Sequence, residues 1–201
     1  MTNKKRSSKK IDNPRYQSIL DAAAKIFREK GYHHANISEI AREVGLQKGS
    51  LYHHIKSKEE LLYEIVISAV DLYIESLREI LTSKKIPGAA IREAIIAHLH
   101  PIDIQFDRIY VFLNEMQNLS DQYRKEVDVQ IEKYERLWVD ILERGKSTGV
   151  FRADLDTKIT VLSIFGMCNW SLRWYRPGGK YDTRELAEMY ARTILDGIKR
   201  V

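Results

Sequence analysis

The chain is poor in the residues that shape disulfide-linked, sheet-rich and membrane-spanning proteins. Its 201 residues include one cysteine, Cys168, which excludes an intramolecular disulfide and a zinc site built from cysteines. Ten glycines and four prolines are few for this length, and a fold with many tight strand turns uses more of both. The longest apolar runs, such as residues 65–67 and 94–97, are far shorter than the ~20 residues of a membrane helix. We therefore expect a helical, cytoplasmic protein with no membrane partner.

Positive charge is concentrated in the first 58 residues. They hold 13 Lys and Arg against five Asp and Glu, a net charge of +8, whereas the rest of the chain carries −3. This asymmetry favours a polyanion such as nucleic acid as the partner of the N-terminal part. Residues 1–13 carry five of these basic side chains and lack the apolar segment of a signal peptide. We interpret them as a basic arm, which either follows DNA or is a solvated tail.

Apolar residues recur at helical spacing along the chain, and no segment alternates convincingly with a period of two. Pro14 and Gly31 are typical start and stop signals of a helix. Asn36, Ser57 and Asp182 are each followed three residues later by Glu, the pattern of a capping box. The sequence therefore predicts an all-α fold of nine helices, near residues 14–30, 37–44, 50–55, 58–80, 87–100, 106–116, 120–145, 157–175 and 183–199.

Two short predicted helices, at 37–44 and 50–55, are joined by a tight turn that contains Gly45. This is the pattern of a helix-turn-helix, and it lies inside the basic segment. The second helix is short enough to enter a major groove about 12 Å wide. Ala41 is small enough for the first helix to pack closely across it.

The residues around this pair closely resemble the DNA-binding domain of the TetR family of transcriptional regulators, over about residues 14–62. The resemblance rests on Gly31-Tyr32, Ile37-x-x-Ile40-Ala41-x-x-x-Gly45-Leu46, Lys48-Gly49-Ser50-Leu51-Tyr52-His53-His54-Ile55 and Lys56-Ser57-Lys58-Glu59-Glu60-Leu61-Leu62. It implies a nine-helix architecture with an arm at 1–13, a DNA-binding domain at 14–57, and an effector-binding and dimerisation domain at 58–201. It also implies a homodimeric repressor that binds a palindromic double-stranded operator and releases it when a hydrophobic effector binds.

The resemblance also assigns the residues that meet DNA. Gln47 and Ser50 would read base edges, and Lys58 would be a phosphate anchor. The alternative to DNA binding is core packing between helices for Tyr52 and capping of a nearby helix end for His54. The full set of expected DNA-binding residues is Ser38, Gln47, Lys48, Gly49, Ser50, Tyr52, His53, His54 and Lys58.

The last two helices supply the dimer interface in the family that the chain resembles. Here they are the predicted helices at 157–175 and 183–199. The sequence alone does not separate interface from core among the apolar candidates, which are Ile159, Leu162, Leu186, Met189, Tyr190, Ile194 and Leu195.

The segment 169–180 is similar to a signature of TetR regulators that repress fatty-acid and steroid catabolism and respond to acyl-CoA thioesters. Arg173, Arg176 and Lys180 could meet CoA phosphates, and Trp170 and Trp174 could flank a long or flat apolar ligand. The alternative is that the tryptophans belong to the core and that the arginines lie at an ordinary helix end. Further residues that could line an effector pocket are Phe106, Tyr110, Met116, Tyr134, Trp138, Phe165 and Asn169.

Other chemistries find little support in the sequence. His98 and His100 are two residues apart, so they do not share a helix face with Asp103 and Asp107, and we expect no metal site. No phosphate-binding loop and no paired nucleophile and base occur, so we expect neither an enzyme nor a cofactor. Two alternatives remain: a TetR-type regulator of drug efflux that responds to cationic hydrophobic compounds, and a ligand-independent DNA-binding protein. The positive charge of residues 173–180 argues against the cationic effector.

Overall fold

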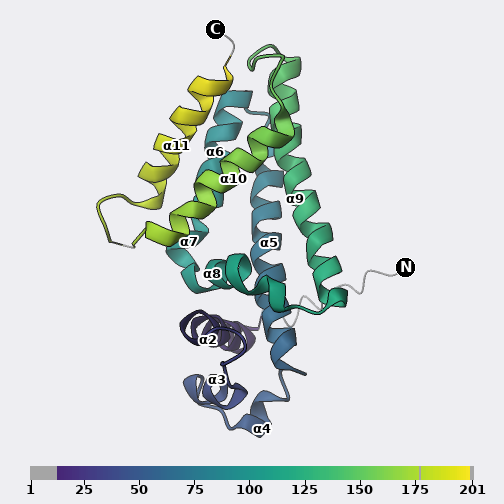
Figure 1. Ribbon diagram of the computed structural model, residues 1–201, viewed down its shortest axis with the longest axis vertical. Helices are drawn as coiled ribbons and strands as arrows, with labels where there is room; N and C mark the ends of the chain where they lie inside the picture. Colours follow the sequence, from purple (N-terminus) through teal and green to yellow (C-terminus); the bar gives the residue numbers. More distant parts are fainter. Residues whose placement is uncertain (1–12, 177, 200–201) are drawn as a thin grey trace. The chain divides into compact units, whose positions relative to one another are not determined.

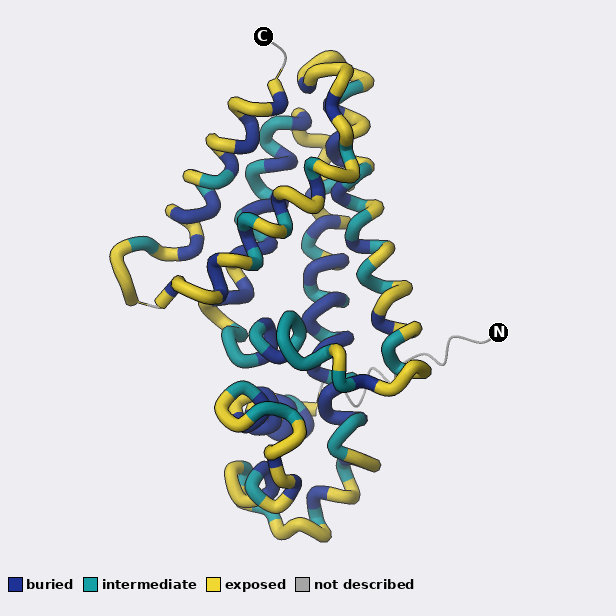
Figure 2. The backbone as a smooth tube through the Cα atoms, in the orientation of Figure 1, coloured by how far each residue is buried: buried dark blue, intermediate teal, exposed yellow. Residues whose placement is uncertain are grey.

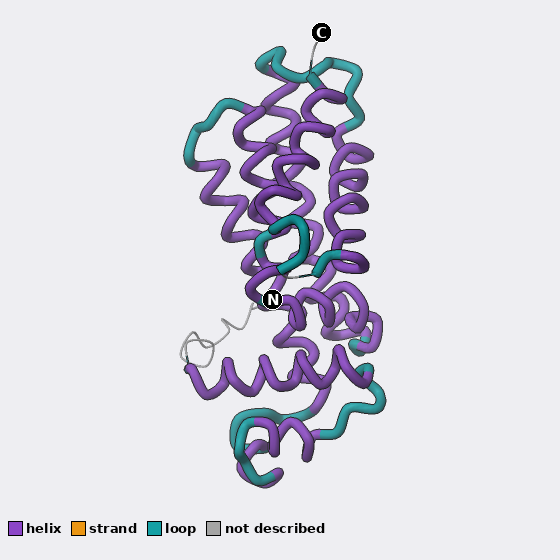
Figure 3. Tube along the Cα trace, turned by 90° about the vertical axis from the view of Figure 1, so that its left-hand side faces the viewer, coloured by secondary structure: helices purple, strands orange, loops and turns teal. Residues whose placement is uncertain are grey.

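The computed structural model describes residues 13–176 and 178–199 (Figure 1). In these ranges the chain is helical apart from its connections, and the β pairing consists of one isolated bridge between Phe151 and Lys199 (Figure 3). This confirms the predicted fold class. No helix in the described part of the chain has the length and apolarity needed to cross a bilayer.

The nine predicted helices are all present, with an extra single turn at Pro101 and a short 3-10 turn after Glu115. The helices are α2 (Pro14–Lys30), α3 (Ile37–Glu43), α4 (Lys48–Leu51), α5 (Lys58–Thr82), α6 (Pro87–Leu99), α7 (Pro101–Ile104), α8 (Phe106–Glu115), η1 (Met116–Asn118), α9 (Asp121–Ser147), α10 (Thr157–Trp174) and α11 (Thr183–Ile198).

The helix ends follow the local signals closely. Asn13 caps α2 by accepting a hydrogen bond from the Arg15 amide (2.9 Å), and Gly31 ends it with a φ of 77°. Asp156 caps α10 in the same way, and Asp182 forms a full capping box at the start of α11. These side chains satisfy amides that have no partner inside the helix.

The second helix of the helix-turn-helix differs from its prediction. α4 begins at Lys48 rather than Ser50 and ends at Leu51. The chain then tightens, because the amides of His53 and His54 bond to the carbonyls three residues before them, at 3.2 and 2.9 Å. Residues 52–54 therefore form a turn rather than a further helical turn.

The chain divides into two compact units. Among the described residues, the first contains 13–69 and 107–125, and the second contains 70–106, 126–176 and 178–199. The chain passes between the units three times, at 69/70, 106/107 and 125/126. These points lie within α5, α8 and α9, so each crossing is made inside a helix and not in a loop.

In the first unit, α3 packs against α2 and α4, and α8 is fastened to α2 by a buried arginine. The Arg108 guanidinium donates hydrogen bonds to Asp21 (2.7 Å) and to the Gln17 side chain (2.8 Å). At the other end of α8, the Glu115 carboxylate accepts a bond from the Tyr32 amide (3.3 Å). The segment 107–125 is thus an integral part of the unit that holds the helix-turn-helix.

In the second unit, α6 packs extensively against α11 and also contacts α10. Apart from His98, its buried side chains are apolar, and they recur along the whole helix. The connection after α9 is closed by Phe151, whose ring lies against Gly145 so tightly that a β-carbon there would be 2.0 Å from the ring. Gly145 is therefore required for this packing.

Candidate DNA-binding surface and effector site

The helix-turn-helix has an apolar inner side. Ile40 and Ala41 of α3 are buried, as are Leu51 and Ile55 around α4. Leu51 and Ile55 therefore belong to the core of this unit and not to its outer side. Gly45, with a φ of 67°, forms the turn that lets α4 fold back onto α3.

The outer side of the same segment carries the side chains expected at DNA. Ser38, Gln47, Lys48, Gly49 and His53 are exposed, and Ser50 and His54 are half-buried. Tyr52 is 48% exposed, so its ring is not a core residue of this chain. A β-carbon on Gly49 would meet nothing within 4 Å, which leaves its backbone open to a close approach.

A surface cleft of about 490 Å³ lies beside α4. It gathers the Lys48 and Tyr52 side chains with the loop before α3 and with the start of α5. His33, His34 and Lys56 also line it and were not among the predicted DNA-binding residues. The signal for Lys56 was its place beside Ser57 in a basic run, whereas the two histidines join the cleft only through the fold. Its cationic and hydrogen-bonding lining suits a phosphate backbone.

Lys58 serves a purpose inside the unit that the sequence did not predict. Its ammonium group donates to the backbone carbonyls of Tyr32 (2.9 Å), His33 (3.2 Å) and Ala35 (3.1 Å). It also lies 4.6 Å from the centre of the Tyr32 ring. Lys58 thus ties the loop before α3 to the first turn of α5 and sets one wall of the cleft.

In the second unit, four of the predicted pocket residues meet in an aromatic cluster. Tyr134 and Phe165 are stacked with ring centres 5.4 Å apart, and Trp138 meets Phe165 edge-on at 5.8 Å. Asn169 joins them from α10, one turn after Phe165. Two members of this cluster were not among the predicted pocket residues: His98 at its centre, which stacks on Phe165 at 5.3 Å, and Tyr73, which stacks on His98 at 5.0 Å.

His98 is held by hydrogen bonds on both ring nitrogens. Nδ1 lies 2.8 Å from the Tyr134 hydroxyl, and Nε2 lies 2.9 Å from the Asn169 side-chain oxygen. Burial lowers the pKa of His98 to about 4, so the imidazole is neutral at pH 7, and burial raises the pKa of Tyr134 well above its ordinary value. The Trp138 indole nitrogen is buried and makes no hydrogen bond of standard geometry.

The predicted effector residues at the end of α10 lie on its surface. Trp170 and Trp174 are 64% and 43% exposed, and Arg173 and Arg176 are also exposed. Arg176 donates to the carbonyl of Tyr175 (2.8 Å). These four side chains therefore do not belong to the buried aromatic cluster, and their part in effector binding stays a prediction.

The candidates for the dimer interface fall into two groups. Ile159, Leu162 and Met189 are exposed, and with Trp170 and Trp174 they give α10 and α11 an apolar outer face; exposed positions recur along both helices in Figure 2. The others are turned into this chain's own core or are half-buried: Leu186, Ile194 and Leu195 are buried, and Tyr190 bonds to Ser171.

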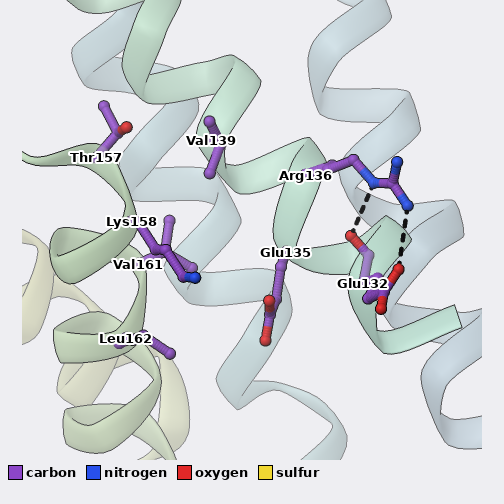
Figure 4. A pocket seen from close by; sticks show the side chains of 8 residues that line it. All are labelled: Glu132, Glu135, Arg136, Val139, Thr157, Lys158, Val161 and Leu162. Carbon is purple, nitrogen blue, oxygen red and sulfur yellow. Dashed lines mark hydrogen bonds and ion pairs between the residues drawn. The ribbon is translucent and has the colours of Figure 1, made fainter. Parts of the chain in front are cut away.

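A groove of about 350 Å³ lies between α9 and α10 (Figure 4). Val139, Val161 and Leu162 make it apolar, while Glu135 and Lys158 add charge of both signs. The Arg136 guanidinium is paired with Glu132 at 3.4 Å. The groove was not predicted, and one of its walls is continuous with the apolar outer face of α10.

The remaining pocket candidates are on α8 and η1. Phe106, Tyr110 and Met116 are half-buried. Tyr110 and Met116 belong to the first unit, whereas the aromatic cluster belongs to the second. Their assignment to an effector pocket also stays a prediction.

Comparison with known proteins agrees with this anatomy. Residues 19–65 match the model of bacterial regulatory proteins of the tetR family, and residues 85–198 match that of the tetracyclin repressor-like C-terminal domain. The chain is 31% identical to the HTH-type transcriptional repressor KstR2 of Mycobacterium tuberculosis over 94% of both proteins. The solved structure of KstR2, a ketosteroid transcriptional regulator, superposes with a TM-score of 0.86, covering 94% of this chain and 97% of that one.

Two further relatives are regulators as well. The fatty acid metabolism regulator protein of Bacillus subtilis is 25% identical over 94% of this chain and 98% of its own. AibR, solved with isovaleryl coenzyme A and operator DNA, superposes with a TM-score of 0.78 at 25% identity, covering 92% of this chain and 98% of that one. The family models and the full-length similarity agree with the helix-turn-helix and its exposed cationic face: this chain belongs to the TetR family of DNA-binding transcriptional regulators.

Proposed function

We propose that this protein represses transcription by binding an operator through the cleft beside α4, and that a hydrophobic effector, an acyl-CoA of fatty-acid or steroid catabolism, releases it. The observation that carries the DNA part is the cleft itself. It brings Lys48, Tyr52 and Lys56 to the outer side of a helix-turn-helix whose inner side is fully packed. Because the target is DNA, we expect the protein to act in the cytoplasm.

The double variant Lys48→Ala/Tyr52→Ala tests the DNA surface. Both side chains are at the surface, so we expect unchanged thermal stability together with at least a tenfold loss of operator affinity. Loss of a lysine–phosphate contact should also lower the slope of log affinity against log salt by about 0.9. Fluorescence anisotropy with the protein's own promoter region measures both. Lys125→Ala removes an exposed charge on α9 and is the matched control; equal affinity of the double variant and this control would contradict the assignment.

We propose that the operator-binding form is a homodimer joined through the outer face of α10 and α11. The support is the exposed apolar set on these helices, which includes Ile159, Leu162 and Met189. Several large apolar side chains exposed on one pair of helices are typical of an interface rather than of a solvated helix face. A two-fold dimer also matches the two half-sites of a palindrome.

The effector class is supported by the relatives and by charge. KstR2 and the Bacillus protein are named for ketosteroid and fatty-acid metabolism, and AibR was solved with an acyl-CoA. In this chain, Arg173 and Arg176 lie exposed near Trp170 and Trp174 at the end of α10, where they could meet the phosphates and adenine of CoA.

Thermal melting against a panel of acyl-CoAs, free fatty acids, steroid acids and cationic dyes tests this class. A ligand at a hundredfold excess over its Kd stabilises the native state by about 2.7 kcal/mol, which is readily measured. We expect stabilisation by CoA thioesters, together with release of the operator in the anisotropy assay. Stabilisation by cationic dyes alone would instead support the efflux regulator, and no response to any compound would support a ligand-independent protein.

A further inference from the structure

The hydrogen bonds around His98 have a fixed direction. A neutral imidazole carries one N–H, so it donates through one nitrogen and accepts through the other. The Asn169 oxygen faces Nε2 and can only accept, which places the ring proton on Nε2. Nδ1 therefore accepts, and the Tyr134 hydroxyl donates to it. Each group in this relay thus sets the proton position of the next.

The relay ends at the Asn169 amide nitrogen. Because the amide oxygen is committed to His98, the nitrogen carries its two N–H groups away from the imidazole. No partner for this nitrogen occurs within the described part of the chain. Asn169 is only partly buried, whereas His98 and Tyr134 are buried. The open end of the network is accordingly a pair of oriented donors that another molecule can reach.

The surroundings limit what those donors can bind. The rings beside His98 are Tyr73, Phe165, Tyr134 and Trp138, and the ring contacts of this cluster include no charged side chain. A carboxylate or an ammonium group would lose its hydration here without gaining a counter-charge. An amine would further present a donor to a donor. A neutral acceptor such as a carbonyl oxygen meets neither penalty.

The cost of this arrangement also indicates a role beyond stability. An apolar side chain in place of His98 would pack in the core without any hydrogen-bond requirement, whereas the imidazole needs a partner on each nitrogen. The relay uses two buried polar side chains, His98 on α6 and Tyr134 on α9, to orient one amide on α10.

We infer that the Asn169 amide is the group that recognises a neutral carbonyl oxygen of the effector, and that His98 and Tyr134 are positioning residues that hold it in the donating orientation. This inference rests on the proposed function, since it concerns the effector of the same regulator. The inference adds a source of specificity, because the site would recognise the carbonyl group of the ligand as well as its hydrophobic part. The carbonyl belongs either to an acyl thioester or to a ring ketone.

Matched ligand pairs test the inference in the full-length protein. Octanoyl-CoA is compared with S-octyl-CoA, in which a methylene replaces the thioester carbonyl, and a ketosteroid is compared with its deoxy counterpart. Affinities come from titration calorimetry. We expect the wild-type protein to prefer the carbonyl member of one pair by about tenfold, and the pair that shows it identifies the source of the carbonyl. Equal affinities within both pairs would overturn the inference while leaving acyl-CoA control intact.

Variants locate the preference. Asn169→Leu and His98→Phe should both reduce the ratio to about one while the carbonyl-free ligand still binds within about threefold of wild type. Asn169→Asp keeps the shape and can still accept from His98, but it lacks the donor, so it should also lose the ratio if the leucine variant does not fold. Ser171→Ala removes a buried hydroxyl on the same helix that bonds to Tyr190, and it should keep the ratio. A ratio that survives in both Asn169 variants would overturn the assignment. Failure of every CoA and steroid ligand to bind wild type would instead overturn the proposed effector class.

Discussion

Burying His98 as a neutral ring ties the stability of the protein to pH. Its pKa in the folded chain is about 4, against about 6.5 for an unfolded histidine. At pH values between these two pKa values, His98 is protonated in the unfolded chain and neutral in the folded chain. The contribution is therefore fully present above about pH 6.5 and is lost as the pH falls toward 4.

We predict that lowering the pH from 7 to 5 removes about 2 kcal/mol of the free energy of unfolding through this residue alone. Urea unfolding at both pH values, at one fixed protein concentration, measures the difference. His98→Phe should flatten the pH dependence by that amount, because no proton uptake remains at this position. A variant with the same pH dependence as wild type would show that the ring is not held neutral in the native state.

The contacts of Lys58 link the start of α5 to the loop before α3, and they lead to a second prediction. Its ammonium group holds three carbonyls of the loop before α3, and hydrogen bonds from charged groups are worth roughly 1.5–3 kcal/mol when one partner is removed. We predict that Lys58→Met destabilises the protein by about that amount and speeds hydrogen exchange of the amides at 32–37. It should also weaken operator binding, because the loop forms one wall of the cleft.

The result separates two roles of the same side chain. Lys56→Met, at an exposed neighbour in the same cleft, should weaken operator binding with little effect on stability. If Lys58→Met behaves like Lys56→Met, with normal hydrogen exchange in the loop, then Lys58 acts as a phosphate anchor and does not stabilise the loop before α3.

Elements were predictable to the extent that their signals are local. Pro14 with Gly31 marks both ends of α2, and Asp182 marks the start of α11, each within a few residues of the observed end. The early end of α4 was not predictable, because it depends on backbone hydrogen bonds from His53 and His54 that no side-chain pattern indicates.

The sites were less predictable, because they join distant segments. The aromatic candidates at 134, 138 and 165 could be chosen by type and helical spacing. The residue between them could not, since His98 meets Asn169 across 71 positions and only the packing of α6 against α10 brings them together. A lone histidine in an apolar helix carries no sign of its partners.

The whole molecule is expected to be a dimer, and two exposed apolar residues give a matched test. Leu162 on α10 and Val129 on α9 are 47% and 48% exposed, but only Leu162 lies on the proposed interface. We predict that Leu162→Glu yields monomers in analytical ultracentrifugation, because a dimer would bury the carboxylate of each copy unpaired. Operator affinity should fall with it, since two half-sites are no longer bound together.

Val129→Glu should leave both the dimer and the operator affinity unchanged. Monomers from the Val129 variant, or a stable dimer from the Leu162 variant, would place the interface elsewhere on the protein.

The chain passes between its two compact units only inside α5, α8 and α9. Proteases cut extended, exposed chain, and at these three points they would find helix instead. Limited digestion of the native protein should therefore cut at the loop around 178–182, between α10 and α11, before it separates the units.

A recombinant fragment of residues 14–57 would lack Arg108 and Glu115, and with them the hydrogen bonds to Asp21 and Tyr32. The compact unit that holds the helix-turn-helix is built from two separate stretches of chain, so it can form only when the segment between them is synthesised as well.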